Sequence, residues 1–250
     1  MNPAELTAIR DSGFALIKNA VDEATVERLT ADCEQAFAED TVVQRARSSR
    51  GHVYAARNLL DVVPEVKTFW RTGKSLQLLQ SVLGNQFGLV RVLFFDKPPD
   101  RTWALPWHKD TAIAVKDNSR PSSNFSRPTL KSGVPHVVAC DDVLQQMLTL
   151  RVHLDDVTDE NGPLRVIPGS HLSSRSEGLG ADAAVTIHAT AGDLLAMRPL
   201  ICHASGSSQA GTTRHRRILH LEFAAGCELA DGYEWHDFVP ANAIPDATQS

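Results

Sequence analysis

The sequence predicts a mainly β protein, a sandwich or barrel of short strands preceded by a helical N-terminal part. From about residue 86 onward, short runs rich in β-branched and aromatic residues alternate with Pro, Gly, Asn and Asp turns. Before that point, apolar residues recur at helical spacing. No interdomain linker is visible, so we expect one domain over residues 1–250, with helices mainly in 1–85, a β core in 86–225 and a tail in 226–250.

The N-terminal part contains one expected strand and two expected helices. Gly13–Ile17 is a short apolar run typical of a strand. Asp22 suits the N-cap of a helix, and Thr72–Leu83 predicts a second helix that stops at Gly84. The first helix has its apolar residues at helical spacing: Val26, Leu29, Cys33 and Phe37.

Eight further short strands are expected in the β core. They are Phe87–Phe95, Ala112–Val115, His136–Ala139, Met147–Leu154, Leu164–Ile167, Ala184–Ile187, Leu194–Met197 and Ile218–Phe223. The segment Asp117–Ser132 between them is rich in Ser, Pro and Asn. It is long for a loop without secondary structure, which predicts either an active-site lid over 117–132 or a plain disordered insertion.

Composition and charge exclude several classes of protein. A net charge of −5 gives no basic footprint, so we expect no nucleic-acid partner. The four cysteines lie far apart without a CxxC pair, which argues against structural zinc and disulfides and favours a reducing compartment. We find neither a signal-peptide pattern nor an apolar run of membrane-spanning length, so we expect a cytoplasmic protein without a membrane partner. Nothing in the sequence predicts its oligomeric state.

The motif that carries chemistry is His108-Lys109-Asp110, together with the distant His203. His108 and Asp110 have the same parity, so on an extended segment both side chains point to one face. Two histidines and one carboxylate cover one face of an octahedral iron(II) ion and leave the opposite face open for substrate. A His-x-Asp sequence by itself is more often structural, so the decision depends on neighbouring features.

Three neighbouring features favour the metal site. The first is the turn–strand–turn segment Asn161–His171, and the second is Ala191–Leu195, which enters the strand leading to His203. The third is the basic cluster Arg214–Arg217, which opens the strand Ile218–Phe223. A guanidinium group there can bind a dicarboxylate through two parallel hydrogen bonds.

These segments together resemble the phytanoyl-CoA dioxygenase family of iron(II)/2-oxoglutarate oxygenases. The family-like segments run over most of the chain in the family's order: Phe95–Pro99, Trp107–Asp110, Asn161–His171, Gly192-Asp193, His203–Gly206 and Arg216-Arg217. The resemblance implies a double-stranded β-helix (jelly-roll, cupin-like) core over 86–225, with Fe(II) as the metal and 2-oxoglutarate and O₂ as cosubstrates. It implies the metal ligands His108, Asp110 and His203.

The resemblance also assigns residues to 2-oxoglutarate. Arg216 matches the family's arginine for the distal carboxylate, but its spacing from His203 is longer than the family's, so Arg217 and Arg214 stay as rivals. Strand alternation does not decide between them. Lys97 matches a family position that helps to hold the cosubstrate, with a solvated loop lysine as the alternative.

The remaining candidates concern the pocket. Arg151 falls where the family has an aromatic residue facing the barrel interior, and a buried cation there needs a carboxylate of substrate, cosubstrate or a neighbour such as Asp155. Thr149 shares the strand face of Arg151 and is a candidate for a hydrogen bond to the cosubstrate. Trp107 and Trp103 are candidates for the pocket mouth, although core packing is the more usual role of such residues.

The implied activity is hydroxylation of a small molecule with release of succinate and CO₂. Arg151, Arg120, Arg127 and Lys131 suggest an acidic or phosphate-bearing substrate, with solvated loop residues as the alternative. Asp110 is the carboxylate that halogenating relatives replace by a small residue, so hydroxylation is favoured, while desaturation, epoxidation and ring closure stay open. The alternative is a cupin-like metal-dependent isomerase or binding protein that does not use 2-oxoglutarate.

Overall fold

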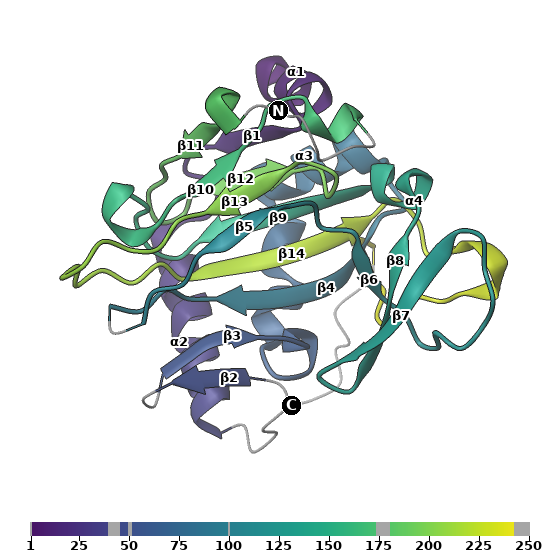
Figure 1. Cartoon of the computed structure of the whole chain (residues 1–250), viewed down its shortest axis with the longest axis horizontal. Helices are drawn as coiled ribbons and strands as arrows, with labels where there is room; N and C mark the ends of the chain where they lie inside the picture. Colours follow the sequence, from purple (N-terminus) through teal and green to yellow (C-terminus); the bar gives the residue numbers. More distant parts are fainter. Residues whose placement is uncertain (1, 40–45, 50–51, 100, 174–180, 243–250) are drawn as a thin grey trace.

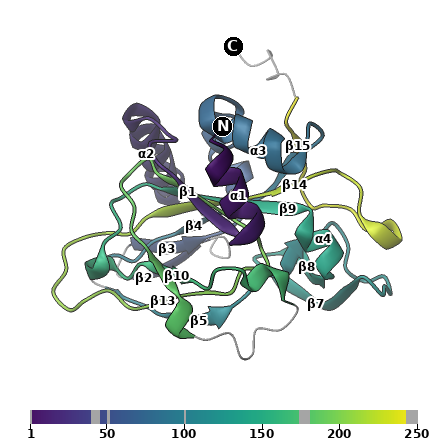
Figure 2. The same cartoon turned by 90° about the horizontal axis from the view of Figure 1, so that it is seen from above.

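A large antiparallel sheet forms the centre of the molecule, and the N-terminal helices lie against one side of it (Figures 1 and 2). The computed structural model describes residues 2–39, 46–49, 52–99, 101–173 and 181–242. Within these residues the strand order is β1-β12-β9-β14-β4-β3-β2, with β15 beside β4. The strands span β1 Phe14–Ile17, β2 Ala46–Ser49, β3 His52–Ala56, β4 Gly88–Phe95, β9 Met147–His153, β12 Leu194–Met197, β14 Ile218–Ala224 and β15 Val239–Pro240.

A smaller sheet lies on the side of the large sheet away from the helices (Figure 2). Its order is β11-β10-β13-β5, with β5 Leu105–His108, β10 Leu164–Val166, β11 Val185–Ile187 and β13 His203–Ser205. An apolar cluster joins the two sheets: Leu164, Val166, Ile187, Leu195, Met197 and Ile201. Two antiparallel sheets packed in this way form the jelly-roll core that the sequence predicts, so the predicted fold class is confirmed.

A third sheet, in the order β6-β8-β7, includes part of the segment 117–132. It consists of β6 Ala112–Ala114, β7 Phe125–Lys131 and β8 Val134–Ala139, so the expectation of a loop without secondary structure over 117–132 is wrong for 125–131. Phe125 is buried, with its ring centroid 4.4 Å from that of Tyr233. Ser132 and Gly133 both have positive φ, which suits the tight turn of a hairpin.

The helices are α1 Pro3–Asp11, α2 Glu23–Glu39, α3 Gly73–Leu83 and the short α4 Asp141–Gln145. Both predicted helices are present: Asp22 Oδ1 accepts a hydrogen bond from the backbone N–H of Thr25 (2.9 Å) at the start of α2, and Gly84 (φ 82°) ends α3. All nine predicted strands are present as well. The sequence did not predict β5 and β13, which carry the motif histidines, because these strands are too short to show an alternation of apolar and polar residues. Among the described helices, none combines the length and apolarity needed to cross a bilayer.

Candidate metal centre

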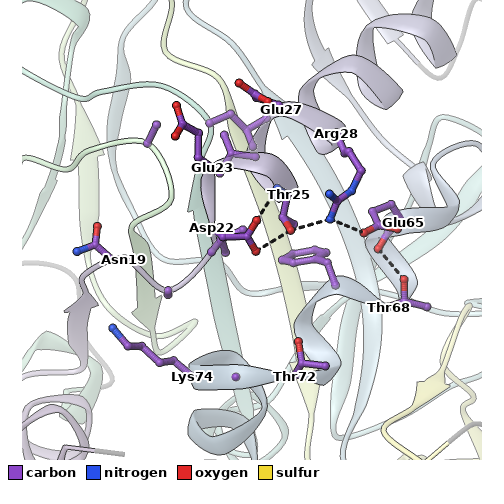
Figure 3. Close-up of a pocket in the computed structure, with 17 residues that line it drawn as sticks. Asn19, Asp22, Glu23, Thr25, Glu27, Arg28, Glu65, Thr68, Thr72 and Lys74 are labelled. Atoms are coloured by element: carbon purple, nitrogen blue, oxygen red, sulfur yellow. Dashed lines mark hydrogen bonds and ion pairs between the residues drawn. The ribbon is translucent and has the colours of Figure 1, made fainter.

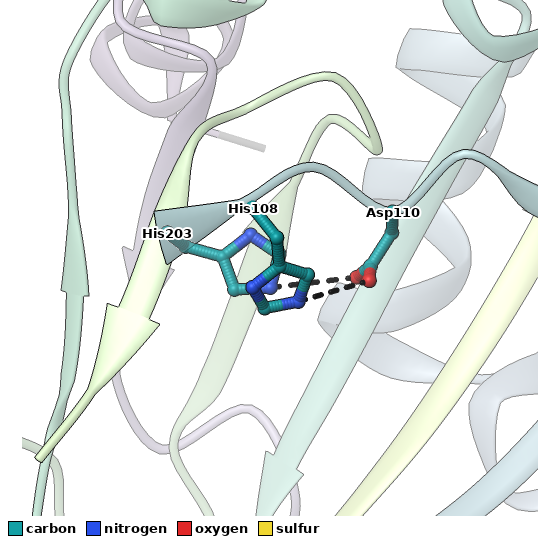
Figure 4. A group of neighbouring side chains, drawn as sticks. All are labelled: His108, Asp110 and His203. Carbon is teal, nitrogen blue, oxygen red and sulfur yellow. Dashed lines mark ion pairs between the residues drawn. The ribbon is translucent and has the colours of Figure 1, made fainter. Parts of the chain in front are cut away.

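Two strands of the smaller sheet bring the three motif side chains together (Figure 4). β5 ends at His108, which pairs in register with His203 of β13, and their ring centroids are 4.2 Å apart. Asp110 follows two residues later, and its backbone N–H donates to the carbonyl oxygen of Pro199 (3.0 Å). Its two carboxylate oxygens each lie 3.5 Å from the Nε2 atom of one histidine. One ligand atom from each residue therefore lies within 4.8 Å of the others.

Backbone carbonyl groups orient both imidazole rings. His108 Nδ1 lies 2.8 Å from the oxygen of Pro106, and His203 Nδ1 lies 3.0 Å from the oxygen of Ile201. Each Nδ1–H donates to its carbonyl, so each Nε2 is left as an electron-pair donor facing Asp110. Neither imidazole ring has to flip for its Nε2 atom to bind a metal ion.

The protonation states of His203 and Asp110 also suit a metal. Burial lowers the pKa of His203 to about 4, so this ring is neutral near pH 7. Burial also works to lower the pKa of His108, but the hydrogen bond and the charge of Asp110 raise it overall. Burial opposes ionisation of Asp110, yet the two imidazoles hold its pKa well below the usual range. Two imidazoles and a carboxylate are the ligand set that fits iron(II) with open positions.

The three side chains face a cavity of about 330 Å³ between the two sheets. Arg216 lines this cavity and is 2% exposed, and its Nε atom has no hydrogen-bond partner in the described part of the chain. Burial, and then repulsion from Arg151, lowers the pKa of Arg216 to about 9. A buried guanidinium whose Nε has no partner among the described residues is costly, so the site fits an anionic ligand.

The two rivals of Arg216 point elsewhere. Arg217 lies on the opposite face of the strand and binds both carboxylate oxygens of Asp155 (3.0 and 2.7 Å) as well as Glu34 (2.7 Å). Arg214 is exposed and pairs with Glu160 at 3.2 Å. Of the three arginines, the structure brings Arg216 alone to the cavity.

Two expected cosubstrate residues do not reach the cavity. Lys97 is fully buried, but its Nζ donates to Gly206 O, Ser205 Oγ (3.0 Å) and Gly162 O (3.3 Å), and it does not line the cavity. Burial lowers the pKa of Lys97 to about 6, and its amino group ties together two turns behind the site. Thr149 is buried on the interior face of β9 but does not line the cavity either.

Trp107 is also misplaced by the sequence prediction. It alternates with His108 on β5 and does not line the cavity, and its ring lies 5.6 Å from the guanidinium carbon of Arg165. Trp103 lines the cavity instead, and its Nε1–H donates to the backbone oxygen of Asp96 (2.9 Å). The strand period would have excluded Trp107, because neighbouring residues on a strand face opposite sides.

Arg151 lines the cavity as expected, but its partner is not Asp155. Its guanidinium donates to His220 Nδ1 (3.1 Å), and His220 Nε2 donates in turn to Glu222 (3.2 Å). Arg91 of β4 binds the same carboxylate. His220, Glu222 and Arg91 were missed by the sequence reasoning, although His220 and Glu222 share the strand parity of Arg216.

A wider hollow of about 1050 Å³ lies on the outer side of the large sheet, near the starts of α2 and α3 (Figure 3). Its polar side chains bind one another: Asp22 accepts from Thr25 (2.8 Å), and Arg28 donates to the Thr25 hydroxyl (2.8 Å). Within the described residues, the triad is the group of side chains placed to hold a metal, so the chemistry belongs to the inner cavity.

Comparisons with known proteins identify the family and the fold. The family model for phytanoyl-CoA dioxygenase (PhyH) matches residues 9–216. The iron/alpha-ketoglutarate-dependent dioxygenase ausU of Aspergillus calidoustus is 26% identical over 89% of this chain and 70% of its own length.

Solved structures share the fold. The EctD protein of S. alaskensis, in a crystal structure with 2-oxoglutarate and 5-hydroxyectoine, superposes with a TM-score of 0.66 at 16% identity, over 90% of this chain and 77% of that one. AviO1 of Streptomyces viridochromogenes Tue57 superposes with a TM-score of 0.61 at 22% identity, over 88% and 93% of the two chains. The match of the family model over most of the chain establishes that the protein belongs to the phytanoyl-CoA dioxygenase family.

Proposed function

We propose that this protein, an Fe(II)- and 2-oxoglutarate-dependent dioxygenase, hydroxylates a small molecule and uses His108, Asp110 and His203 as its metal ligands. The single observation that carries the proposal is the convergence of these three side chains beside the buried guanidinium of Arg216, whose Nε has no hydrogen-bond partner among the described residues. A metal-binding set alone fits any cupin-like protein. A metal-binding set with an anion-binding arginine in the same cavity fits an enzyme that uses a dicarboxylate.

The chain's own residues would bind and orient the reactants. Bound iron(II) supplies the chemistry of oxidative decarboxylation, in which 2-oxoglutarate and O₂ give succinate and CO₂ while the substrate is oxidised. His108, Asp110 and His203 would occupy one face of the ion and leave the other face toward the cavity. Arg216 would bind the distal carboxylate of 2-oxoglutarate, and its burial makes that ion pair strong.

Hydroxylation is the proposed outcome because Asp110 keeps a carboxylate in the ligand set. The alternative of a cupin-like isomerase or binding protein has no use for Arg216 and is not supported. A cytoplasmic location stays part of the proposal, supported by the four cysteines Cys33, Cys140, Cys202 and Cys227, each of which is a free thiol.

The test is anaerobic titration of the apoprotein with Fe(II) and then 2-oxoglutarate. We expect a visible charge-transfer band, and succinate once air is admitted. His203→Ala should weaken metal binding by at least about 100-fold, because loss of a direct ligand exceeds the effect of losing its supporting groups. His188→Ala, at an exposed histidine on the surface, is the matched control and should keep the band. A band that survives His203→Ala would show that the ligand assignment is wrong.

A further inference from the structure

A second cavity adjoins the one that holds the triad. It measures about 460 Å³ and shares four lining residues with the first: Arg57, Phe95, Trp103 and Lys131. The two cavities therefore lie against the same four side chains, which form a shared wall and also line the space that His108 and His203 face. A substrate held against these four residues would lie in the cavity that the triad faces.

The second cavity has a largely apolar and aromatic lining. Phe95 and Trp103 form part of it, with ring centroids 6.4 Å apart, and Tyr54 lines the same space. Leu130, on β7, lies at its edge and is 71% exposed, which is unusual for a large apolar side chain. The lining favours a hydrocarbon or aromatic body over a purely polar molecule.

The charges lining the inner cavity are strongly unbalanced. Among the described residues that line it, two are carboxylates, Asp110 and Glu222, whereas six are basic: Arg57, Arg91, Lys109, Lys131, Arg151 and Arg216. Binding of iron(II) and 2-oxoglutarate does not remove the excess, since the two carboxylates of 2-oxoglutarate offset the two positive charges of the ion. The cavity therefore retains positive charge for a further anion.

Most of these cations are already occupied. Arg91 binds Glu222, and Lys109 donates to the backbone oxygens of Ser170 (2.9 Å) and Ser173. Lys131 differs, because its Nζ atom has no hydrogen bond or ion pair with any described residue. Burial lowers the pKa of Lys131, and the positive charges of Arg91 and Arg57 lower it further, although the carboxylates of Glu222 and Asp110 act in the opposite direction. An anion beside Lys131 would relieve this repulsion.

The hairpin of β7 and β8 carries Lys131 to the shared wall. Lys131 is the last residue of β7, directly before the tight turn at Ser132 and Gly133. Asn58 Nδ2 donates to the backbone oxygen of Ser132 (3.3 Å), which ties the turn to the chain segment that carries Arg57. Two cations from distant parts of the sequence are thus held on one wall.

We propose that the substrate is an amphipathic organic acid whose anionic group binds between Lys131 and Arg57, with its apolar body against Phe95, Trp103 and Leu130. This inference rests on the proposed function for the position of the reacting end. The shared chemistry is an anion joined to an apolar body, and either a carboxylate or a phosphate ester supplies it.

A matched pair of fluorescent probes tests the proposal. 1-Anilinonaphthalene-8-sulfonate is an amphipathic anion, and N-phenyl-1-naphthylamine is the same aromatic body without the charge. Both are titrated into protein loaded anaerobically with Fe(II) and 2-oxoglutarate, so that the 2-oxoglutarate site is filled. We expect Lys131→Met to weaken binding of the anion by about 10-fold and binding of the neutral probe by less than about 2-fold, as loss of one charge-assisted contact predicts.

The control is Lys116→Met, which removes an exposed lysine that pairs with Glu234 and lines neither cavity. It should leave both probes unaffected. Octanoate and octyl phosphate should displace the anionic probe, whereas octanol should not, and the stronger of the two anions identifies the head group. Equal displacement by octanol, or equal effects of Lys131→Met on both probes, would overturn the proposal.

The anaerobic charge-transfer band separates this proposal from the one on which it rests. Lys131 is not a metal ligand or a 2-oxoglutarate ligand, so Lys131→Met should retain the band. If the wild-type protein gives no band, the proposed function fails. If the band is present but probe binding does not depend on Lys131, the anion site alone is refuted.

Discussion

The two faces of the central strands β9 and β14 have opposite chemistry, although both faces are buried. The face toward the helices is apolar and includes Leu150, Val152, Leu219, Leu221 and Phe223. The face toward the smaller sheet carries ionisable groups, including Arg151, His153, His220 and Glu222. Because neighbouring side chains on a strand point to opposite faces, buried apolar residues and buried ionisable residues lie on the two sides of the same sheet.

The difference teaches where stability and function reside. Apolar burial on the outer face stabilises the fold directly, by roughly 25 cal/mol per Å². Burial of the ionisable groups on the inner face stabilises the fold little. These groups are tolerated because they pair with one another or can bind an anionic ligand. Substitutions on the outer face should therefore lower the free energy of unfolding, and substitutions on the inner face should weaken ligand binding.

The largest expected effect separates neighbouring arginines that lie on opposite faces. Arg216→Met should weaken 2-oxoglutarate binding by about 10³-fold, equivalent to about 4 kcal/mol, because the distal carboxylate would lose a buried bidentate partner. The free energy of unfolding should not fall, since the guanidinium has no hydrogen-bond partner for its Nε in the described part of the chain. Titration of the anaerobic charge-transfer band and denaturant unfolding measure the two quantities.

Arg217→Met is the matched control one residue away. It removes the ion pairs with Asp155 and Glu34, so it should lower the free energy of unfolding by about 1–2 kcal/mol, with allowance for partial exposure. Cosubstrate affinity should stay within about 2-fold. A reversal, with Arg217→Met affecting cosubstrate and Arg216→Met affecting stability alone, would break the comparison.

These arginines also show how far the sequence could predict the site. The ligands His108, Asp110 and His203 could be found because a short motif and an ordered family pattern name them directly. Arg216 was favoured over Arg214 and Arg217 from the family pattern alone, because parity fixes which residues share a face but not which face is inside. That depends on which side the helices cover, which is a property of the whole fold.

The failures at Lys97 and Asp155 have a related cause. Lys97 lies in a family-like segment, but its donors are used by turns more than sixty residues away in the chain, such as Gly162. Asp155 is close to Arg151 in sequence, yet it binds Arg217 across the strand pair. Partners of charged groups are set by packing between distant segments, whereas strands and helix caps are set by local pattern, which is why the predicted elements were present.

The second prediction concerns the outer face. Leu221→Ala should lower the free energy of unfolding by about 3 kcal/mol, because Leu221 is fully buried among helices and sheet and its truncation leaves a cavity. The charge-transfer band should be unchanged, since the ligands lie on the other side of the sheet. Denaturant unfolding measures the loss.

Leu93→Ala sharpens the same point from the inner face. Leu93 lines the metal cavity, so its truncation enlarges an existing space and should lower the free energy of unfolding by only about 1–2 kcal/mol. Equal losses at Leu221 and Leu93 would mean that the two faces contribute equally to stability.

The smallest expected effect is a pH dependence of stability from the inner face. Burial lowers the pKa of His153 from 6.5 to about 4, the hydrogen bond with Asp193 O opposes the shift, and the charges of Arg151 and Arg216 add to it. The folded state therefore binds fewer protons than the unfolded state between pH 4 and 6.5. Stability is present above pH 6.5 and falls as the pH is lowered, by at most about 1.4 kcal/mol per pH unit for one such group.

His153→Gln removes this titrating group, so the stability lost between pH 7 and pH 5.5 should shrink by about 1 kcal/mol relative to wild type. His188→Gln, at a half-exposed surface histidine, is the control and should leave the pH dependence within error. Denaturant unfolding at the two pH values measures both. If the stability of the His153→Gln variant falls with acid as steeply as that of wild type, protonation of His153 does not destabilise the folded state. The inner face would then accept a charged imidazole at this position, contrary to the contrast drawn between the two faces.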